Sequence, residues 1–85
     1  MDWELYAWFK RGSRRREVLQ LLAKSSEPMT ANEIKSELKI ALSQASFTLR
    51  ELSNKKLVEC LNPKDKIGKI YKSSDTGKGL LNESQ

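Results

Sequence analysis

The side chains best suited to recognition chemistry lie between positions 43 and 50 of the chain. They carry hydroxyls, a carboxamide, an aromatic ring and a guanidinium, which can bond to a base edge, contact a thymine methyl or neutralise a phosphate. These candidate residues are Ser43, Gln44, Ser46, Phe47 and Arg50. Their chemistry is non-covalent, so the segment predicts binding to a nucleic acid. Phe47 has a second interpretation, because an aromatic ring at this place can also pack against protein.

These side chains need a helix to hold them on one side. Ala45, Leu49 and Leu52 recur at helical spacing and form an apolar stripe opposite the candidate residues. The pattern predicts a helix over about 42–55 with a buried back and a polar, basic front. A helix of this kind suits insertion into the major groove of double-stranded DNA.

A shorter helix is expected immediately before this one. Thr30 and Glu33 match the T-x-x-E capping box, which predicts a helix over about 31–39. The next helix starts near Ala41 without a serine or threonine cap, so either Ser43 caps it later or no side chain does. Two short helices joined by a tight connection are typical of a helix-turn-helix.

Two strands are predicted after the second of these helices. LVECL at 57–61 and KIYKS at 69–73 flank the polar loop NPKDKIG, and Met29 with Thr30 can add a further short strand. The hairpin places three lysines at its loop and edges: Lys64, Lys66 and Lys69. Such a wing can lie on a phosphate backbone or in the minor groove, although a lysine-rich hairpin also protects a sheet edge from aggregation.

The N-terminal segment 1–12 contains a helix candidate, DWELYAWFK, that is apolar nearly all round. A small domain offers one face for such a helix to pack on, so the remaining apolar side chains predict a homodimer contact. The candidate contact residues are Trp3, Leu5, Tyr6, Trp8 and Phe9. The alternative is a helix folded across the domain's own core with one aromatic side chain left exposed.

A second helix is expected over about 14–24, with Ser13 as its cap. Several arginines and a lysine cluster around its start. Arg14 and Arg15 are the candidates for contacts to flanking phosphates. A solvated basic face explains the same cluster equally well.

Length and charge limit the range of functions. The 85 residues suit one domain over 1–85, with a winged helix-turn-helix at 13–81 and a frayed tail at 82–85. A net charge of +5 favours binding to polyanions such as nucleic acid.

The sequence has no apolar run near the roughly 20 residues of a membrane span, and its start is acidic and aromatic, unlike a signal peptide. We therefore expect a cytoplasmic protein with no membrane partner.

Catalysis and metal binding are not expected. The chain has no histidine and one cysteine, so it lacks the usual general base, a Cys-His nucleophile pair and a plausible zinc site. No cofactor motif is present. Cys60, beside Val58 in a predicted strand, is expected to be a small buried hydrophobe, with a redox-sensing thiol or an intermolecular disulfide as the alternative.

The segments SQASFTLREL, NKKLVECLNP and SSDTGKGLL resemble winged-helix transcriptional regulators of the ArsR and MarR types. The resemblance is strongest to small single-domain regulators widespread in archaea. It implies a mainly α fold with a small β-hairpin (α+β): a three-helix core, a wing and, here, an extra N-terminal helix. It also implies a homodimer that binds operator DNA, with the candidate residues of 43–50 near the groove and Lys66 and Lys69 in the wing. The cysteine pairs and histidines of metal-sensing relatives are missing.

The leading hypothesis is therefore a sequence-specific DNA-binding regulator. A protein–protein adaptor is the main alternative, because winged helices are also used as adaptors inside larger assemblies. The aromatic N-terminal helix would then be the working surface. RNA binding ranks last, since the candidates for stacking on unpaired bases, Trp3, Tyr6 and Trp8, lie in the N-terminal helix and not in the predicted reading helix.

Overall fold

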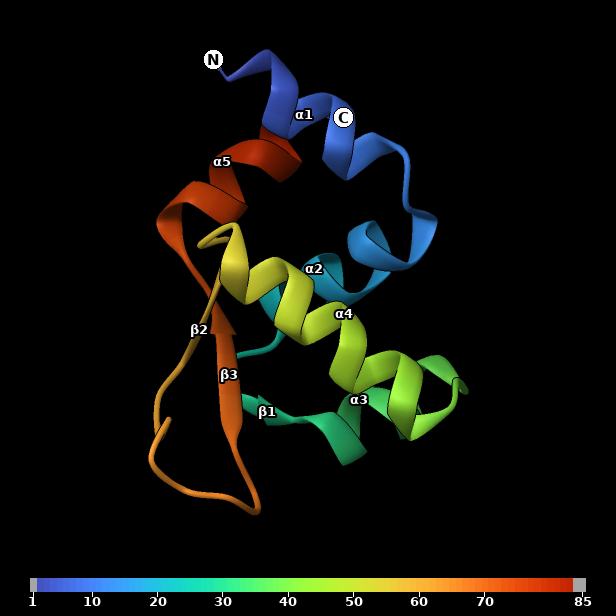
Figure 1. The fold of residues 1–85 in the computed structure, drawn as a ribbon, viewed down its shortest axis with the longest axis vertical. Helices are drawn as coiled ribbons and strands as arrows, with labels where there is room; N and C mark the ends of the chain where they lie inside the picture. Colours follow the sequence, from blue (N-terminus) through green and yellow to red (C-terminus); the bar gives the residue numbers. More distant parts are fainter. Residues whose placement is uncertain (1, 84–85) are drawn as a thin grey trace.

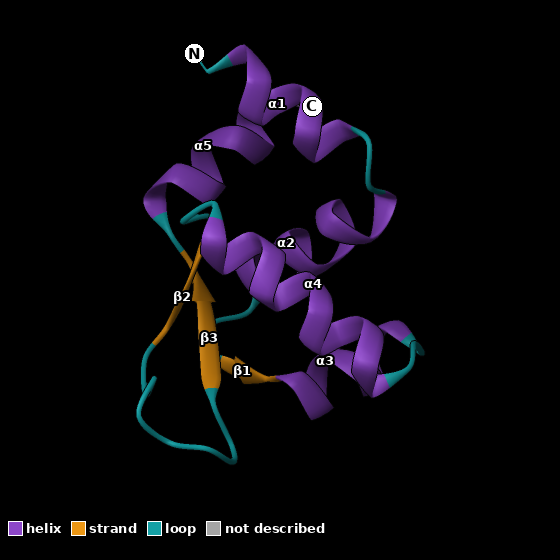
Figure 2. Cartoon of the chain, viewed as in Figure 1, coloured by secondary structure: helices purple, strands orange, loops and turns teal. Residues whose placement is uncertain are grey.

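A three-helix core with a small sheet beside it forms the centre of the computed structural model, which describes residues 2–83 (Figures 1 and 2). In chain order the elements are α1 (Trp3–Lys10), α2 (Ser13–Lys24), β1 (Met29–Thr30), α3 (Ala31–Leu38), α4 (Leu42–Asn54), β2 (Val58–Cys60), β3 (Ile70–Ser73) and α5 (Asp75–Glu83). The predicted class, a mainly α fold with a small antiparallel sheet, is confirmed. None of the described helices is both long enough and apolar enough to cross a bilayer.

The core lies where α2, α3 and α4 face one another. Leu19 of α2, Ile34 of α3 and Leu52 of α4 are fully buried there. The predicted stripe of α4 is confirmed, because Ala45 and Leu49 are buried beside Leu52. Burial of a large aliphatic side chain stabilises a fold by about 1.5–3 kcal/mol. The back of α4 is therefore held firmly in place.

The sheet is antiparallel, with strand order β1-β3-β2. Met29 pairs with Tyr71 across β1 and β3, which confirms the short additional strand. On the other side of β3, Cys60 of β2 pairs with Tyr71. The strand β2 begins one residue later than expected, because the Leu57 amide still donates to the Leu52 carbonyl at the end of α4. The loop between β2 and β3 extends to the end of the molecule opposite α1 (Figure 1).

The ends of α3 and α4 follow local hydrogen bonding. The capping box of α3 is confirmed: the Glu33 amide donates to Thr30 Oγ1 at 3.1 Å, and the Thr30 amide donates to Glu33 Oε1 at 2.9 Å. Lys39 ends the helix in the left-handed region, with φ at 56°. At α4, Ala41 occupies the N-cap position and provides no side-chain hydrogen bond, so Ser43 lies within the helix and is not its cap.

The start of α2 differs from the prediction. The helix begins at Ser13, and Gly12 takes the N-cap position that Ser13 was expected to fill. The Gly12 carbonyl accepts hydrogen bonds from the amides of Arg15 and Arg16. An extended glycine therefore starts the helix without a side-chain cap.

The C-terminal helix α5 is anchored at its start. Ser74 caps it as expected, since its Oγ accepts the Gly77 amide at 3.0 Å and donates to the Lys56 carbonyl at 2.7 Å. The helix extends to Glu83, so residues 82 and 83 are helical and not frayed. Residues 84 and 85 of the predicted tail lie outside the described part of the chain.

Helix α1 packs on the domain's own core. Phe9, a predicted dimer contact, is 1% exposed, which corrects that prediction: the ring fills the protein's own interior. Leu5, Tyr6 and Trp8 are partly buried against the same core. Trp3 is 71% exposed and its ring meets the Tyr6 ring edge-on, with centroids 6.1 Å apart. Helix α1 is therefore folded across the domain's own core with Trp3 exposed, and a dimer contact through its exposed side chains stays a prediction.

Candidate nucleic-acid interface

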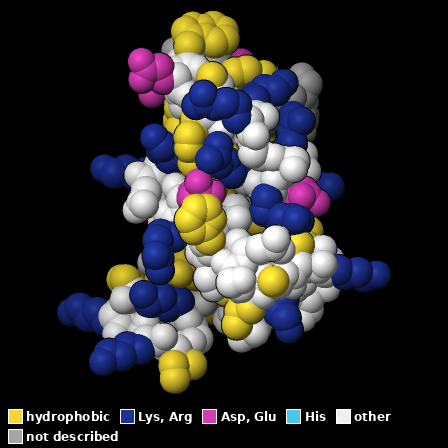
Figure 3. All heavy atoms as spheres, turned by 45° about the vertical axis from the view of Figure 1, so that its right-hand side comes forward, with side chains coloured by type: hydrophobic (Ala, Val, Ile, Leu, Met, Phe, Trp, Pro, Cys, Tyr) yellow, Lys and Arg dark blue, Asp and Glu magenta, His cyan; other side chains and the backbone are white. Residues whose placement is uncertain are grey.

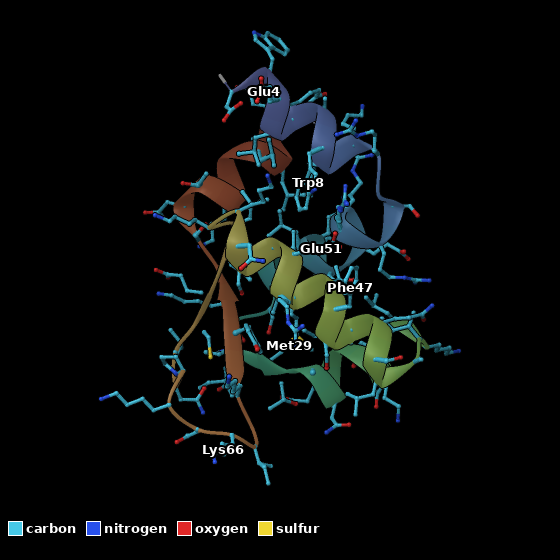
Figure 4. All side chains as sticks on the ribbon, viewed as in Figure 1. Glu4, Trp8, Met29, Phe47, Glu51 and Lys66 are labelled. Atoms are coloured by element: carbon cyan, nitrogen blue, oxygen red, sulfur yellow. The ribbon has the colours of Figure 1, made fainter. Side chains whose placement is uncertain are left out.

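The outer face of α4 presents a set of mixed polar and aromatic side chains to solvent. All five candidate residues are exposed: Ser43, Gln44, Ser46, Phe47 and Arg50. Phe47 is 61% exposed, so its ring does not pack into the core of this chain, and contact with DNA or with another protein remains as the prediction. Its position on the helix points it away from the buried stripe, and Figure 4 shows it on the outer side of α4. The helix thus has a rigid buried back and a free front.

One of these side chains has a preset orientation. Gln44 Oε1 accepts a hydrogen bond from the Ala41 amide at 3.2 Å, which is the half of a capping box that requires no side-chain oxygen at Ala41. The Nε2 group then remains as the available donor. Gln44 is therefore better suited to donating to a phosphate or a base acceptor than to bidentate pairing with adenine, which requires both amide atoms.

The wing is organised by Asn62. Its Oδ1 accepts the Ile70 amide at 2.8 Å, and its Nδ2 donates to Asp65 Oδ2 at 2.9 Å and to the Gly68 carbonyl at 3.1 Å. One side chain thus joins both ends of the loop to its middle. Gly68 adopts a φ of +73°, which a side chain would disfavour.

The predicted wing lysines differ in exposure. Lys64 and Lys66 are exposed, and Figure 4 shows Lys66 at the outer loop; Lys69, nearer the base of the wing, is half-buried. Asp65, the one acidic residue between positions 61 and 69, is bound by Asn62. The loop therefore presents positive charge outwards. The face turned forward in Figure 3 likewise carries many more lysine and arginine side chains than acidic ones.

A groove joins α4 to the wing. It is lined by Leu42 and Ser46 of α4, by the start of α3 including Asn32, and by the wing residues Lys66, Gly68 and Lys69, with Tyr71 of β3. Asn32 was missed by sequence reasoning; its place in the first turn of a capped helix was the available signal. The groove brings two predicted elements, separated in sequence, into one continuous surface.

Tyr71 of this groove has a raised pKa. Burial is the main cause, because the phenolate loses hydration; negative charge at Cys60 adds to the increase, and the Arg50 guanidinium opposes it.

Cys60 itself is half-buried, and its Sγ lies 3.7 Å from Asn62 Oδ1. It was expected to be fully buried, but strand β2 lies at the edge of the sheet, where the loop covers it incompletely. Residues 2–83 contain no cluster of side chains that could hold a metal ion.

The two candidate arginines of α2 have different environments. Arg15 Nη2 lies 3.0 Å from Glu51 Oε2, its guanidinium stacks on the Trp8 ring, and it donates to the Trp8 carbonyl. With its side chain only 19% exposed, Arg15 is occupied within the domain and is not available to a flanking phosphate. Arg14 pairs only with Glu17, at 3.3 Å, and lines a shallow groove beside Phe47. Arg14 therefore remains next to the exposed face of α4.

Comparisons with known proteins agree with this architecture. Residues 14–60, more than half of the chain, match a helix-turn-helix domain family. Among solved structures, the reduced form of MarR from E. coli is similar with a TM-score of 0.75 and 28% identity, covering 95% of this chain and 60% of that one. A mutant MarR from E. coli complexed with operator DNA gives a TM-score of 0.75 at 26% identity, over 94% of this chain and 57% of that one. A MepR mutant from S. aureus gives 0.77 at 25% identity, over 96% of this chain and 59% of that one.

These similarities define the fold as a winged helix-turn-helix of the MarR type, in which the loop after β2 is the wing. The chain spans about three fifths of the length of these structures. No curated protein matched the sequence.

Proposed function

We propose, given that this chain belongs to the helix-turn-helix domain family, that it binds double-stranded DNA sequence-specifically as a transcriptional regulator. Helix α4 enters the major groove, and the wing lies on the backbone or in the minor groove. The exposed front of α4 above a fully buried back carries this proposal. The complex of a MarR mutant with operator DNA supports it by analogy.

The side chains of α4 supply the reading contacts. Arg50 contacts a phosphate or the O6 and N7 atoms of a guanine, and Ser43 and Ser46 make short polar contacts near the helix start. Gln44 donates from its free amide nitrogen. Phe47 is exposed and apolar, so it contacts a thymine methyl or a sugar.

Lysine and arginine side chains beside α4 supply binding energy that does not depend on the base sequence of the DNA. Lys64, Lys66 and Lys69 reach the backbone from the wing side, and Arg14 reaches it beside Phe47. Arg15 is excluded from this set because Glu51 already neutralises it.

We further propose that two copies form a homodimer through α1 and α5. A groove between these helices is lined by Leu5, Thr76, Gly79 and Leu80, with Asp2 and Glu83 at its ends. Trp3 stands exposed on α1 and can fill the groove of a second copy. A two-fold dimer would place its reading helices about 34–36 Å apart, one turn of DNA.

Sedimentation over a concentration series tests the proposed dimer. Trp3→Ser should weaken dimerisation, and an unchanged dimerisation constant would exclude Trp3 from the dimer contact.

A backbone amide NMR titration with a mixed-sequence duplex tests the DNA-binding proposal. We expect shifts concentrated at residues 43–50 and 64–69 that shrink as salt is raised. Silence of both segments at low salt would contradict the proposal. If only α1 then responds to a protein partner, the adaptor function takes its place.

A further inference from the structure

Ile67 stands at the outer part of the wing with 90% of its surface exposed. Other exposed large hydrophobic side chains of the described chain, such as Phe47 and Trp3, are 61% and 71% exposed. A single exposed apolar side chain is common and by itself carries no function. The loop around Ile67, however, gives it two properties that a merely tolerated surface residue lacks.

The first property is rigidity of the support. The three hydrogen bonds of Asn62 tie the loop from Asp65 to Ile70, and Gly68 turns the chain directly after Ile67. The side chain of isoleucine is itself stiff, because branching at Cβ restricts χ1. A preorganised loop and a stiff side chain lose little entropy when they become fixed in a complex.

The second property is the charge around the apolar tip. Lys64 and Lys66 precede Ile67, Lys69 follows it, and the carboxylate of Asp65 is held by Asn62. In Figure 3, hydrophobic side chains at the lower left lie beside a group of lysine and arginine side chains. Lysines on both sides of an apolar side chain along one loop suit the two rows of phosphates that border a DNA groove.

We propose that Ile67 is an apolar wedge that enters the minor groove, partly unstacks one base step and bends the duplex. The lysines of the wing hold the flanking phosphates while the side chain inserts. Flexible pyrimidine–purine steps are the least costly to open, so the wedge would favour such steps outside the segment read by α4. This inference rests on the proposed DNA-binding function and adds a second source of sequence preference to it.

The test begins with selection of tight-binding duplexes from a random-sequence pool by the wild-type protein. The most enriched duplex then serves as the probe for affinity, by fluorescence polarisation, and for bending, by energy transfer between its labelled ends. The variants are Ile67→Ala, which removes the wedge; Ile67→Leu, which retains apolar bulk; and Lys66→Ala, a neighbouring control that removes only charge. Because Ile67 and Lys66 are exposed, thermal unfolding should be unchanged in all three.

We expect Ile67→Ala to bind about five- to fifty-fold more weakly and to lose most of a wild-type bend of about 20–90°. Its dependence of affinity on salt should equal that of the wild type, because no charge is removed. Ile67→Leu should retain the bend, whereas Lys66→Ala should lower the magnitude of the salt slope by about 0.9 for each copy bound, or about 1.8 for a dimer, and leave the bend in place. If Ile67→Ala binds and bends the duplex as the wild type does, the wedge is overturned while DNA binding stands. If the wild type enriches no duplex, the proposed function itself fails.

Discussion

Arg15 Nη2 lies 3.0 Å from Glu51 Oε2, so that an ion pair joins the start of α2 to the middle of α4. The same guanidinium lies over the Trp8 ring of α1, with Cζ 3.9 Å from the ring centroid. Lys55, the C-cap residue of α4, places its Nζ 5.3 Å from the centroid of that ring. Figure 4 shows Trp8 and Glu51 between α1 and α4. Three helices, α1, α2 and α4, therefore meet at one partly buried cluster.

A double-mutant cycle on Arg15→Ala and Glu51→Ala should give a coupling free energy of about 1 kcal/mol in urea unfolding, because both side chains are largely shielded from water. The matched control is the Arg14–Glu17 pair, whose side chains are 39% and 48% exposed. Its coupling should be below about 0.5 kcal/mol. Equal coupling free energies in the two cycles would contradict the expectation that the shielded Arg15–Glu51 pair contributes more to stability than the exposed pair.

Gly77→Ala should destabilise the protein by about 2–4 kcal/mol, because an added Cβ would lie 2.2 Å from the Leu57 carbonyl oxygen. Gly79→Ala in the same helix meets open space and should stabilise it by about 0.5–1 kcal/mol. Denaturant unfolding at low protein concentration separates these effects from dimerisation. Destabilisation by both variants would mean that α5 tolerates no added methyl on either side.

Asn62→Ala should loosen the wing without unfolding the core. The variant removes the acceptor of the Ile70 amide and the donors to Asp65 and Gly68. Amide hydrogen exchange at Ile70 should accelerate, while that at Leu49 stays slow. Asp65→Ala is the matched control, since it removes only one of the three contacts and should keep Ile70 protected. Rapid exchange at Leu49 in Asn62→Ala would show that the wing supports the core.

Arg50→Ala should weaken binding to the selected duplex by about 1–3 kcal/mol if the guanidinium reads a base, and by less if it meets only a phosphate. For a dimer that neutralises about six to eight phosphates, log affinity of the wild type should fall with log salt at a slope of about −5 to −7. Arg15→Ala is the internal comparison and should leave this slope unchanged. Wild-type affinity in Arg50→Ala would remove Arg50 from the interface.

Tyr71 should ionise above its ordinary pKa of 10.0, because burial disfavours the phenolate. Because folding raises this pKa, the contribution of Tyr71 to the free energy of unfolding is fully present below pH 10. This contribution is lost as the pH rises through the pKa of the folded state. Ultraviolet titration of the wild type against Tyr71→Phe isolates this group. Arg50→Ala should raise the pKa of Tyr71 further, and a decrease would contradict the proximity of Arg50 to the ring.

Much of the fold was predictable because it depends on neighbours in sequence. The capping box of Thr30 and Glu33, the stripe of Ala45, Leu49 and Leu52, and the loop between β2 and β3 all follow from residue types a few positions apart. The exposed face of α4 followed as well, because the side of a helix opposite its buried stripe must face outwards. The roles proposed for that face remain predictions.

Only the tertiary structure decided which side chains are already occupied. The sequence suggested that Arg15 was free to bind phosphate, but in the fold it pairs with Glu51, 36 positions away. The sequence also suggested that Phe9 was a dimer contact, but in the fold it is buried in the protein's own core. Asn62 and Gly77 carried no sequence signal for their long-range contacts. Periodicity reports which face of an element is apolar, whereas the partner of each side chain depends on how distant elements pack. The sequence therefore determined the elements and their faces, and the packing of α1 and α2 against α4 determined which charges remain for a ligand.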